Sequence, residues 1–119
     1  YLHNLIVKEE VKMLRIGVTI GIKEDKIEEY KKLHAKVWPE VLENLTELNF
    51  KNYSIYLHNN MLFGYMEYHG SDIERDNLLM ASNKKVQEWW SVCGPCQIPD
   101  PNRKKGEWWS VMEEVFHHE

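Results

Sequence analysis

Strict alternation of apolar with polar or small side chains over residues 14–23 constrains the fold more than any other feature of this chain. The apolar positions are Leu14, Ile16, Val18, Ile20 and Ile22. Side chains two residues apart lie on the same face of a strand, so the pattern predicts a β-strand. A period of two over this length is a strong signal, and the strand is the first element that the sequence predicts.

The next segment changes to the period of a helix. Apolar and aromatic side chains recur at spacings of three and four, at Ile27, Tyr30, His34, Trp38, Val41, Leu45 and Leu48. This spacing is typical of one face of an amphipathic helix. Pro39 interrupts it, because proline lacks the backbone donor that a helix interior needs. We therefore expect a helix to about Val37, a break at Trp38 and a second helix with Pro39 in its first turn.

Two strands joined by a turn are predicted in the middle of the chain. Residues 53–57 and 62–69 are rich in aliphatic and aromatic side chains, as strands are. The connection His58-Asn59-Asn60 lies between them, and asparagine tolerates the left-handed backbone conformation of tight turns.

The last third predicts a helix in two parts, a loop and a closing strand. Ser71 and Asp72 offer an N-cap for the first part, and Ser82 offers one for its continuation. Residues 93–106 contain two glycines and three prolines, the composition of a loop. Residues 108–116 alternate again, which predicts the closing strand.

The predicted order is β-α-β-β-α-β, the arrangement of ferredoxin-like α+β domains. Four antiparallel strands with helices on one face leave the other face bare, and a partner subunit would cover it, so we expect a homodimer. Trp108 and Trp109 are adjacent on the closing strand and would point to opposite faces. We expect one of them at the dimer interface and the other packed inward.

Composition narrows the classes of function. A length of 119 residues fits one domain, which we place at residues 13–119, with residues 1–12 as an N-terminal extension of uncertain origin. The net charge of −4 lacks the basic surface of a nucleic-acid binder. The longest uncharged run, residues 52–66, is too short and too polar to span a membrane. No secretory signal is visible and two cysteines form no disulfide framework, so we expect a cytoplasmic protein.

Cys93-Gly94-Pro95-Cys96 matches the redox motif of thioredoxins. That chemistry needs the first cysteine at the start of a helix, where its thiol pKa is lowered. Pro99 and Pro101 follow closely and exclude the long helix, so a redox function is disfavoured. Two cysteines also lack the further ligands of a zinc site, and we expect no bound metal.

Tyr30, His34 and Trp38 lie along one stripe of the predicted helix. Taken alone, this stripe favours a hydrophobic core with a hydrogen-bonded histidine at its edge. It also fits a pocket in which His34 acts as an acid or a base near neutral pH.

Trp89 and Trp90 are adjacent on a predicted helix, and their side chains therefore point about 100° apart. One is expected in the core, while the other faces a cleft or an interface. Indoles stack on the apolar face of a sugar, and the hydroxyl groups of Tyr30 and Tyr53 suit its polar rim. The set fits a carbohydrate site or a hydrophobic dimer interface.

Four segments together resemble the L-rhamnose mutarotase family. They are residues 29–40 (EYKKLHAKVWPE), 52–57 (NYSIYL), 89–90 (WW) and 114–116 (EVF). The most specific part is His-x-x-x-Trp-Pro-Glu, from His34 to Glu40. The resemblance implies a ferredoxin-like, dimeric α+β barrel that interconverts sugar anomers without a cofactor. The loop with the two cysteines and the second tryptophan pair depart from the family pattern.

Carried over residue by residue, the resemblance implies that His34 is catalytic and that Tyr30, Tyr53, Trp89 and Trp90 bind the substrate. We expect a monosaccharide, L-rhamnose or a related 6-deoxy hexose. His34 would donate a proton to the ring oxygen, while Tyr30, Tyr53 or a bound water handles the anomeric hydroxyl. The alternative is a non-catalytic ligand-binding or regulatory dimer of the same fold.

Overall fold

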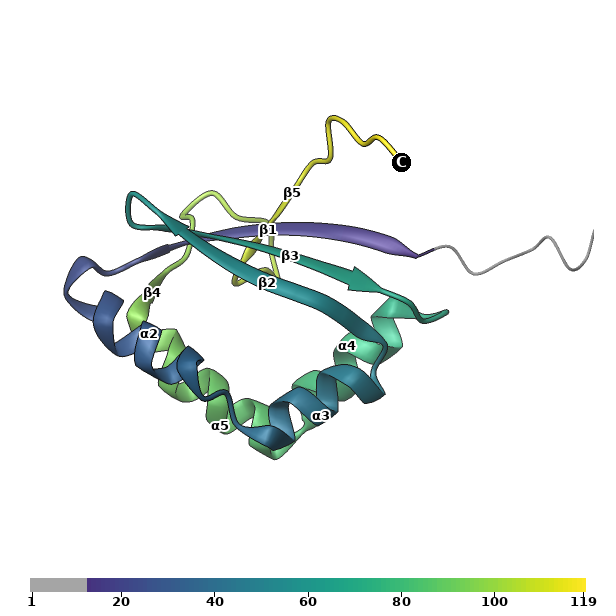
Figure 1. Cartoon of the computed structure of the whole chain (residues 1–119), viewed down its shortest axis with the longest axis horizontal. Coiled ribbons are helices and arrows are strands. Elements are labelled where there is room, and N and C mark those ends of the chain that lie inside the picture. The colour runs from purple at the N-terminus through teal and green to yellow at the C-terminus, as the bar shows by residue number, and fades with distance from the viewer. Residues whose placement is uncertain (1–12) are drawn as a thin grey trace, which may run out of the picture.

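The computed structural model describes residues 13–119 as a curled antiparallel sheet with helices on one face (Figure 1). The N-terminal extension expected over residues 1–12 lies outside the described residues. Within residues 13–119, no helix is both long and apolar enough to cross a membrane.

The sheet has the strand order β2-β3-β1-β4, and β5 also pairs with β1. The strands are β1 (Leu14–Ile22), β2 (Phe50–His58), β3 (Met61–Tyr68), β4 (Gln97–Ile98) and β5 (Ser110–Met112). Every strand pair among them is antiparallel. The predicted α+β fold with the ferredoxin-like order of elements is therefore confirmed. The closing strand expected over residues 108–116 is wrong in extent, because only residues 110–112 pair with β1.

The helical segments are split as the sequence predicts. They are α2 (Ile27–Ala35), α3 (Pro39–Glu47), α4 (Ile73–Ser82) and α5 (Lys84–Cys93), with single 3-10 turns at Glu24–Lys26 and Gly94–Cys96. Pro39 is in the first turn of α3, where the backbone donor that proline lacks is not needed. The break between the first two helices is confirmed.

The N-caps of α4 and α5 are formed by two different residues. Asp72 accepts a hydrogen bond from the backbone N–H of Arg75, as expected. The cap predicted at Ser82 is wrong, because Ser82 is still helical and its hydroxyl donates to the carbonyl of Leu79. Asn83 has an extended backbone, and its side chain caps α5 instead.

The core lies between the inner face of the sheet and the helices. Alternate residues of β1, namely Val18, Ile20 and Ile22, are buried there. Asn59 and Asn60 form the turn between β2 and β3 with φ of 49° and 61°, which confirms the turn predicted from their tolerance of this region.

A β-bulge shifts the register between β2 and β3, and it decides the direction of Tyr53. Phe50 pairs with Tyr68, but Ser54 rather than Tyr53 pairs with Tyr65. Asn52 supplies the bulge with φ of 51°. The extra residue places Tyr53 on the inner face of the sheet, facing the helices.

Candidate active site

A cavity of about 240 Å³ lies between α2 and the inner face of the sheet. Its wall consists of Ile22, Ile27, Tyr30, Lys31, His34, Ile55, Tyr56, Leu57 and Leu62. The wall is mainly aliphatic, and Tyr30, Lys31 and His34 supply polar groups on its helical side. This combination is typical of sites for small molecules.

His34 and Tyr30 are one helical turn apart and stack on each other, with ring centroids 4.1 Å apart. The Nδ1 atom of His34 donates to the backbone carbonyl of Tyr30 at 2.9 Å. A carbonyl oxygen only accepts, so Nδ1 holds the proton and Nε2 is left with its lone pair. Burial lowers the pKa of His34 below its ordinary value of 6.5, which favours this neutral form. The imidazole is therefore suited to accept a proton at neutral pH.

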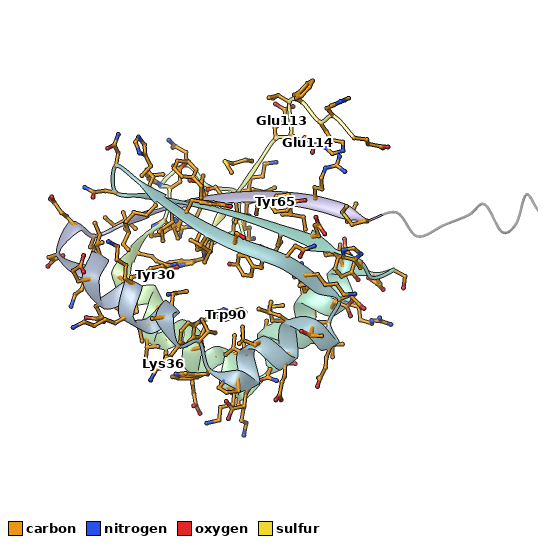
Figure 2. The ribbon with its side chains drawn as sticks, in the orientation of Figure 1. Tyr30, Lys36, Tyr65, Trp90, Glu113 and Glu114 are labelled. Atoms are coloured by element: carbon orange, nitrogen blue, oxygen red, sulfur yellow. The ribbon has the colours of Figure 1, made fainter. Side chains whose placement is uncertain are left out.

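Trp89 and Trp90 have different environments, as their adjacency predicts. Trp89 is buried, 6% exposed, and packs edge-to-face on both His34 and Trp38, with centroids 5.2 Å away in each case. Trp90 is 45% exposed and lies on the sheet side of α5 (Figure 2). Neither indole is in the wall of the cavity: Trp89 packs against His34, and Trp90 has its exposed surface outside that wall.

Tyr53 lies on the inner face of the sheet, outside the wall of the cavity. Its ring lies over Gly64, with Cε1 3.6 Å from the place where a Cβ of that glycine would be. Tyr53 is 38% exposed, but the apolar surroundings of its hydroxyl group raise its pKa to about 12. Burial raises the pKa of Tyr30 strongly, with a further contribution from Tyr53. Both phenols therefore stay protonated over the physiological range and can donate hydrogen bonds.

Gln97 is a neighbour of the site that sequence reasoning missed. Its amide donates to the hydroxyl oxygen of Tyr30 at 3.3 Å, and it accepts a hydrogen bond from the indole of Trp108 at 2.8 Å. A glutamine in a proline-rich loop gives no sequence signal of this kind.

The second tryptophan pair only half follows its prediction. Trp109 packs inward against the core, as expected for one of the two. The premise that both lie on the closing strand is wrong, because the strand begins only at Ser110. Trp108 is 45% exposed and donates to Gln97, and its place at a dimer interface stays a prediction.

Cys93 and Cys96 are free, buried thiols. Burial raises the pKa of Cys93 to about 12 and also raises that of Cys96, whose Sγ donates to a carboxylate oxygen of Glu29 at 3.7 Å. Cys93 ends a helix instead of starting one. These thiols are not activated nucleophiles, in agreement with the disfavoured redox function. No group of three potential metal-ligating side chains occurs among the residues that the structure describes.

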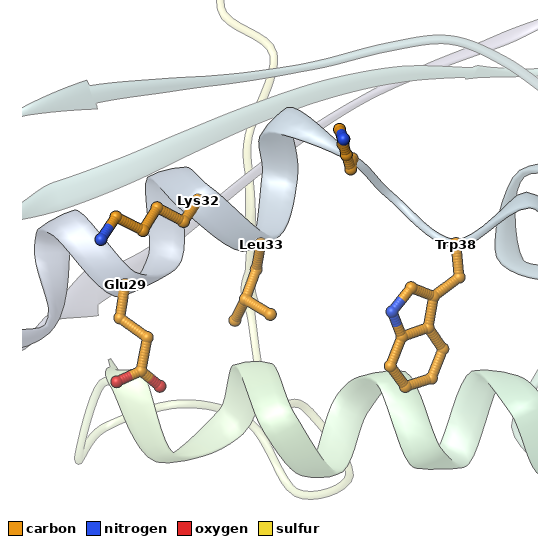
Figure 3. A pocket seen from close by; sticks show the side chains of 5 residues that line it. Glu29, Lys32, Leu33 and Trp38 are labelled. Atoms are coloured by element: carbon orange, nitrogen blue, oxygen red, sulfur yellow. The ribbon is translucent and has the colours of Figure 1, made fainter.

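A second cavity, of about 460 Å³, lies on another side of α2 (Figure 3). Glu29, Lys32, Leu33, Lys36 and Trp38 line it. It is larger, but neither His34 nor a tyrosine is in its wall. We therefore place the candidate active site in the smaller cavity.

The curled sheet and the helices on one face define a ferredoxin-like α+β domain with a cavity between the two layers. Comparison with known proteins identifies the family. The sequence profile of L-rhamnose mutarotase matches residues 15–118. An L-rhamnose mutarotase from Oceanobacillus iheyensis is 34% identical over 107 residues, covering 88% of this chain and 98% of the relative. One from Bacillus subtilis is 36% identical over 85 residues, covering 70% and 79%.

Solved structures agree on the fold. The crystal structure of L-rhamnose mutarotase FA22100 from Formosa agariphila has a TM-score of 0.71 at 24% identity, covering 89% of this chain and 99% of that one. Tetracenomycin F2 cyclase from Streptomyces glaucescens has a TM-score of 0.64 at 15% identity, covering 88% and 95%. The chain belongs to the L-rhamnose mutarotase family and is an isomerase of the racemase and epimerase class that acts on carbohydrates.

Proposed function

We propose that this protein interconverts the α and β anomers of L-rhamnose or a closely related 6-deoxy hexose, with His34 as its acid–base group. The observation that supports this role most directly is the hydrogen bond from Nδ1 of His34 to the carbonyl of Tyr30, 2.9 Å long. It fixes a neutral tautomer whose Nε2 can accept a proton. The membership of the chain in a sugar mutarotase family supports the substrate class.

One imidazole is sufficient for both proton transfers of ring opening. Nε2 of His34 accepts the proton of the anomeric hydroxyl, and the imidazolium then donates it to the ring oxygen as the bond between that oxygen and the anomeric carbon breaks. Rotation of the open aldehyde and the reverse transfers close the other anomer and restore the neutral imidazole. Donation to the ring oxygen, expected from the sequence, is the second half of this cycle. General acid–base catalysis of this kind raises the reaction rate by about 10²–10⁴-fold.

The tyrosines orient the sugar in this proposal. Their raised pKa values keep Tyr30 and Tyr53 protonated, so their hydroxyl groups donate to sugar oxygens without losing a proton. Trp90 is the indole with an accessible surface for stacking on the sugar ring. We assign Trp89 the task of holding the imidazole, because it packs on His34.

The cavity supports a single small sugar. Its volume of about 240 Å³ lies below the range of about 300–1,000 Å³ that is common for drug-sized ligands. Its aliphatic wall, which includes Ile22, Ile55 and Leu62, suits the 6-methyl group of a deoxy sugar better than a hydroxymethyl group.

We also propose that the protein is a homodimer. The outer face of the sheet exposes a set of apolar side chains, namely Tyr56, Met61, Phe63, Ile98 and Met112. Tyr56 alone is 65% exposed. A second copy would cover this face. Light scattering after size exclusion tests the proposal: the wild type elutes as a dimer and Phe63→Glu as a monomer, and a monomeric wild type would reject it.

The two free thiols support a cytoplasmic location, because a reducing compartment keeps buried cysteine pairs unoxidised. Fractionation of cells that express the native chain would place it in the soluble cytoplasmic fraction. Recovery from an oxidising compartment would reject this location.

Saturation-difference NMR of L-rhamnose tests the catalytic proposal. The wild type should speed up exchange between the two anomeric resonances, and His34→Ala should lose this effect. His118→Ala, a change at an exposed histidine near the C-terminus, is the matched control and should keep it. If the wild type binds the sugar but leaves exchange at its spontaneous rate, the alternative of a non-catalytic binding protein is correct.

A further inference from the structure

Gln97 is a buried polar side chain, 7% exposed, that bridges two aromatic residues. The Nε1 atom of Trp108 donates to its Oε1 at 2.8 Å, and its Nε2 donates to the hydroxyl oxygen of Tyr30 at 3.3 Å. The bridge connects the loop before β5 with the wall of the candidate active site. Neither the family resemblance nor the sequence pattern assigns a role to it.

The indole N–H of Trp108 determines the direction of both hydrogen bonds in this bridge. An indole N–H can only donate, so the group of Gln97 that faces Trp108 is the carbonyl oxygen. The amide nitrogen then faces Tyr30, and because it can only donate, the hydroxyl oxygen of Tyr30 accepts. The proton of that hydroxyl is thereby left for another acceptor.

The backbone fixes Gln97 in this position. Gln97 pairs with Ile22 in the sheet, so its side chain lies on the same inner face as that buried isoleucine. The backbone N–H of Lys23 donates to the carbonyl of Cys96 at 2.8 Å, and Cys96 is fully buried. The backbone of the segment that contains the two cysteines therefore holds Gln97 next to the site.

We infer that Gln97, oriented by Trp108, is a positioning residue that turns the hydroxyl proton of Tyr30 toward the substrate. The inference rests on the proposed anomer interconversion. With the lone pair of Tyr30 engaged by the amide, its O–H donates to a sugar oxygen at the reacting carbon. This donor is strongest when negative charge develops on that oxygen in the transition state, so the effect falls on kcat more than on KM.

Kinetics of anomer exchange test the role. Gln97→Leu should lower kcat about three- to tenfold, the loss of one hydrogen bond, and change KM less than about twofold. Gln97→Glu should lower kcat further, because a carboxylate accepts from both Trp108 and Tyr30 and draws the hydroxyl proton away from the sugar. Gln87→Leu, at an exposed glutamine of α5, is the matched control and should match the wild type.

The background of Tyr30→Phe separates positioning from a structural effect. Gln97→Leu should cause no further loss of kcat there, since the group on which it acts is gone. A loss of the same size in both backgrounds would overturn the role. So would an unchanged kcat of Gln97→Leu in an otherwise active protein, which would leave the proposed function intact. A wild type that accelerates no anomer exchange would overturn both.

NMR of the ligand-free protein provides a readout without activity. In protein labelled with ¹³C at tyrosine Cζ, the Tyr30 signal is identified by its loss in Tyr30→Phe. Gln97→Leu and Trp108→Phe should both shift this signal, while Gln87→Leu should not. A Tyr30 signal that stays in place in Gln97→Leu would overturn the inference.

Discussion

The Nδ1 atom of His34 donates to the backbone carbonyl of Tyr30, 2.9 Å away and one turn earlier in the same helix. This single bond determines the tautomer of the imidazole and leaves Nε2 free. Trp89 packs against the same ring edge-to-face, with centroids 5.2 Å apart, and limits its movement. The proton-accepting atom of the proposed site therefore has a fixed orientation before any substrate binds.

The first prediction concerns the pH dependence of the reaction. Burial lowers the pKa of His34 below its ordinary 6.5, and the proposed cycle begins with the neutral imidazole. We expect kcat/KM to stay constant from neutral pH downward and to fall only below about pH 6.5, as His34 takes up a proton. Anomer exchange rates measured across this range check the prediction. A midpoint above the ordinary value of histidine would contradict it.

The second prediction separates the two adjacent tryptophans. Trp89→Ala leaves a cavity behind His34 and should lower the free energy of unfolding by about 3–5 kcal/mol. Trp90→Ala changes an exposed side chain and should lower it by about 1 kcal/mol or less, while raising KM for the sugar. Urea unfolding and anomer exchange measure the two effects. Equal losses of stability would show that Trp90 is also part of the core.

Much of the fold could be predicted because local chemistry determined it. The alternation over residues 14–23 identifies β1, and Pro39 begins the second helix because its fixed φ and missing N–H suit a first turn. Asn59 and Asn60 mark a turn through their tolerance of positive φ. Each of these signals lies within a few residues of the feature that it predicts.

The features of the fold that the sequence did not predict depend on contacts between distant segments. The closing strand alternates over residues 108–116, yet only residues 110–112 find a partner in β1. Serine and asparagine are both good N-cap residues. Asn83 rather than Ser82 caps α5 because the backbone becomes extended at Asn83. The composition around Gln97 predicts a loop, but its pairing with Ile22 directs its side chain toward the site. No single sequence window contains these facts.

In the candidate site, too, some features follow from local sequence and others from contacts between distant segments. The helical period places Tyr30 and His34 on one stripe, and the structure brings them together in the cavity wall. The choice of Tyr53 over Tyr56 rests on the family resemblance. Its inward direction depends on a bulge, which strict alternation cannot predict.

The third prediction concerns acid stability. Asp76 is buried and accepts hydrogen bonds from the hydroxyl of Tyr68 and the amide of Asn49. The Tyr68 hydroxyl, above all, holds the pKa of Asp76 below its ordinary value of 3.8. The carboxylate thus stabilises the fold above that value, and this contribution is lost as the pH falls through the lowered pKa.

Asp76→Asn removes this titration from the folded protein. Its free energy of unfolding should be lower than that of the wild type near neutral pH, and the difference should shrink below about pH 4. Urea unfolding at a series of pH values measures both curves. A difference that stays constant into strong acid would show that Asp76 does not titrate differently in the folded and unfolded states.

The fourth prediction tests the bulge that directs Tyr53 inward. Asn52 has φ of 51°, and its side chain donates to Glu67 at 2.7 Å. Asn52→Val and Asn52→Gly both remove that hydrogen bond, but only valine is strained at this φ, by about 1–2 kcal/mol. Relief of the strain removes the bulge and turns Tyr53 toward the outer face. We therefore expect Asn52→Val to lose stability and anomer exchange activity, while Asn52→Gly keeps its activity. Urea unfolding and kcat compare the pair, and equal activities would show that Tyr53 keeps its direction without the bulge.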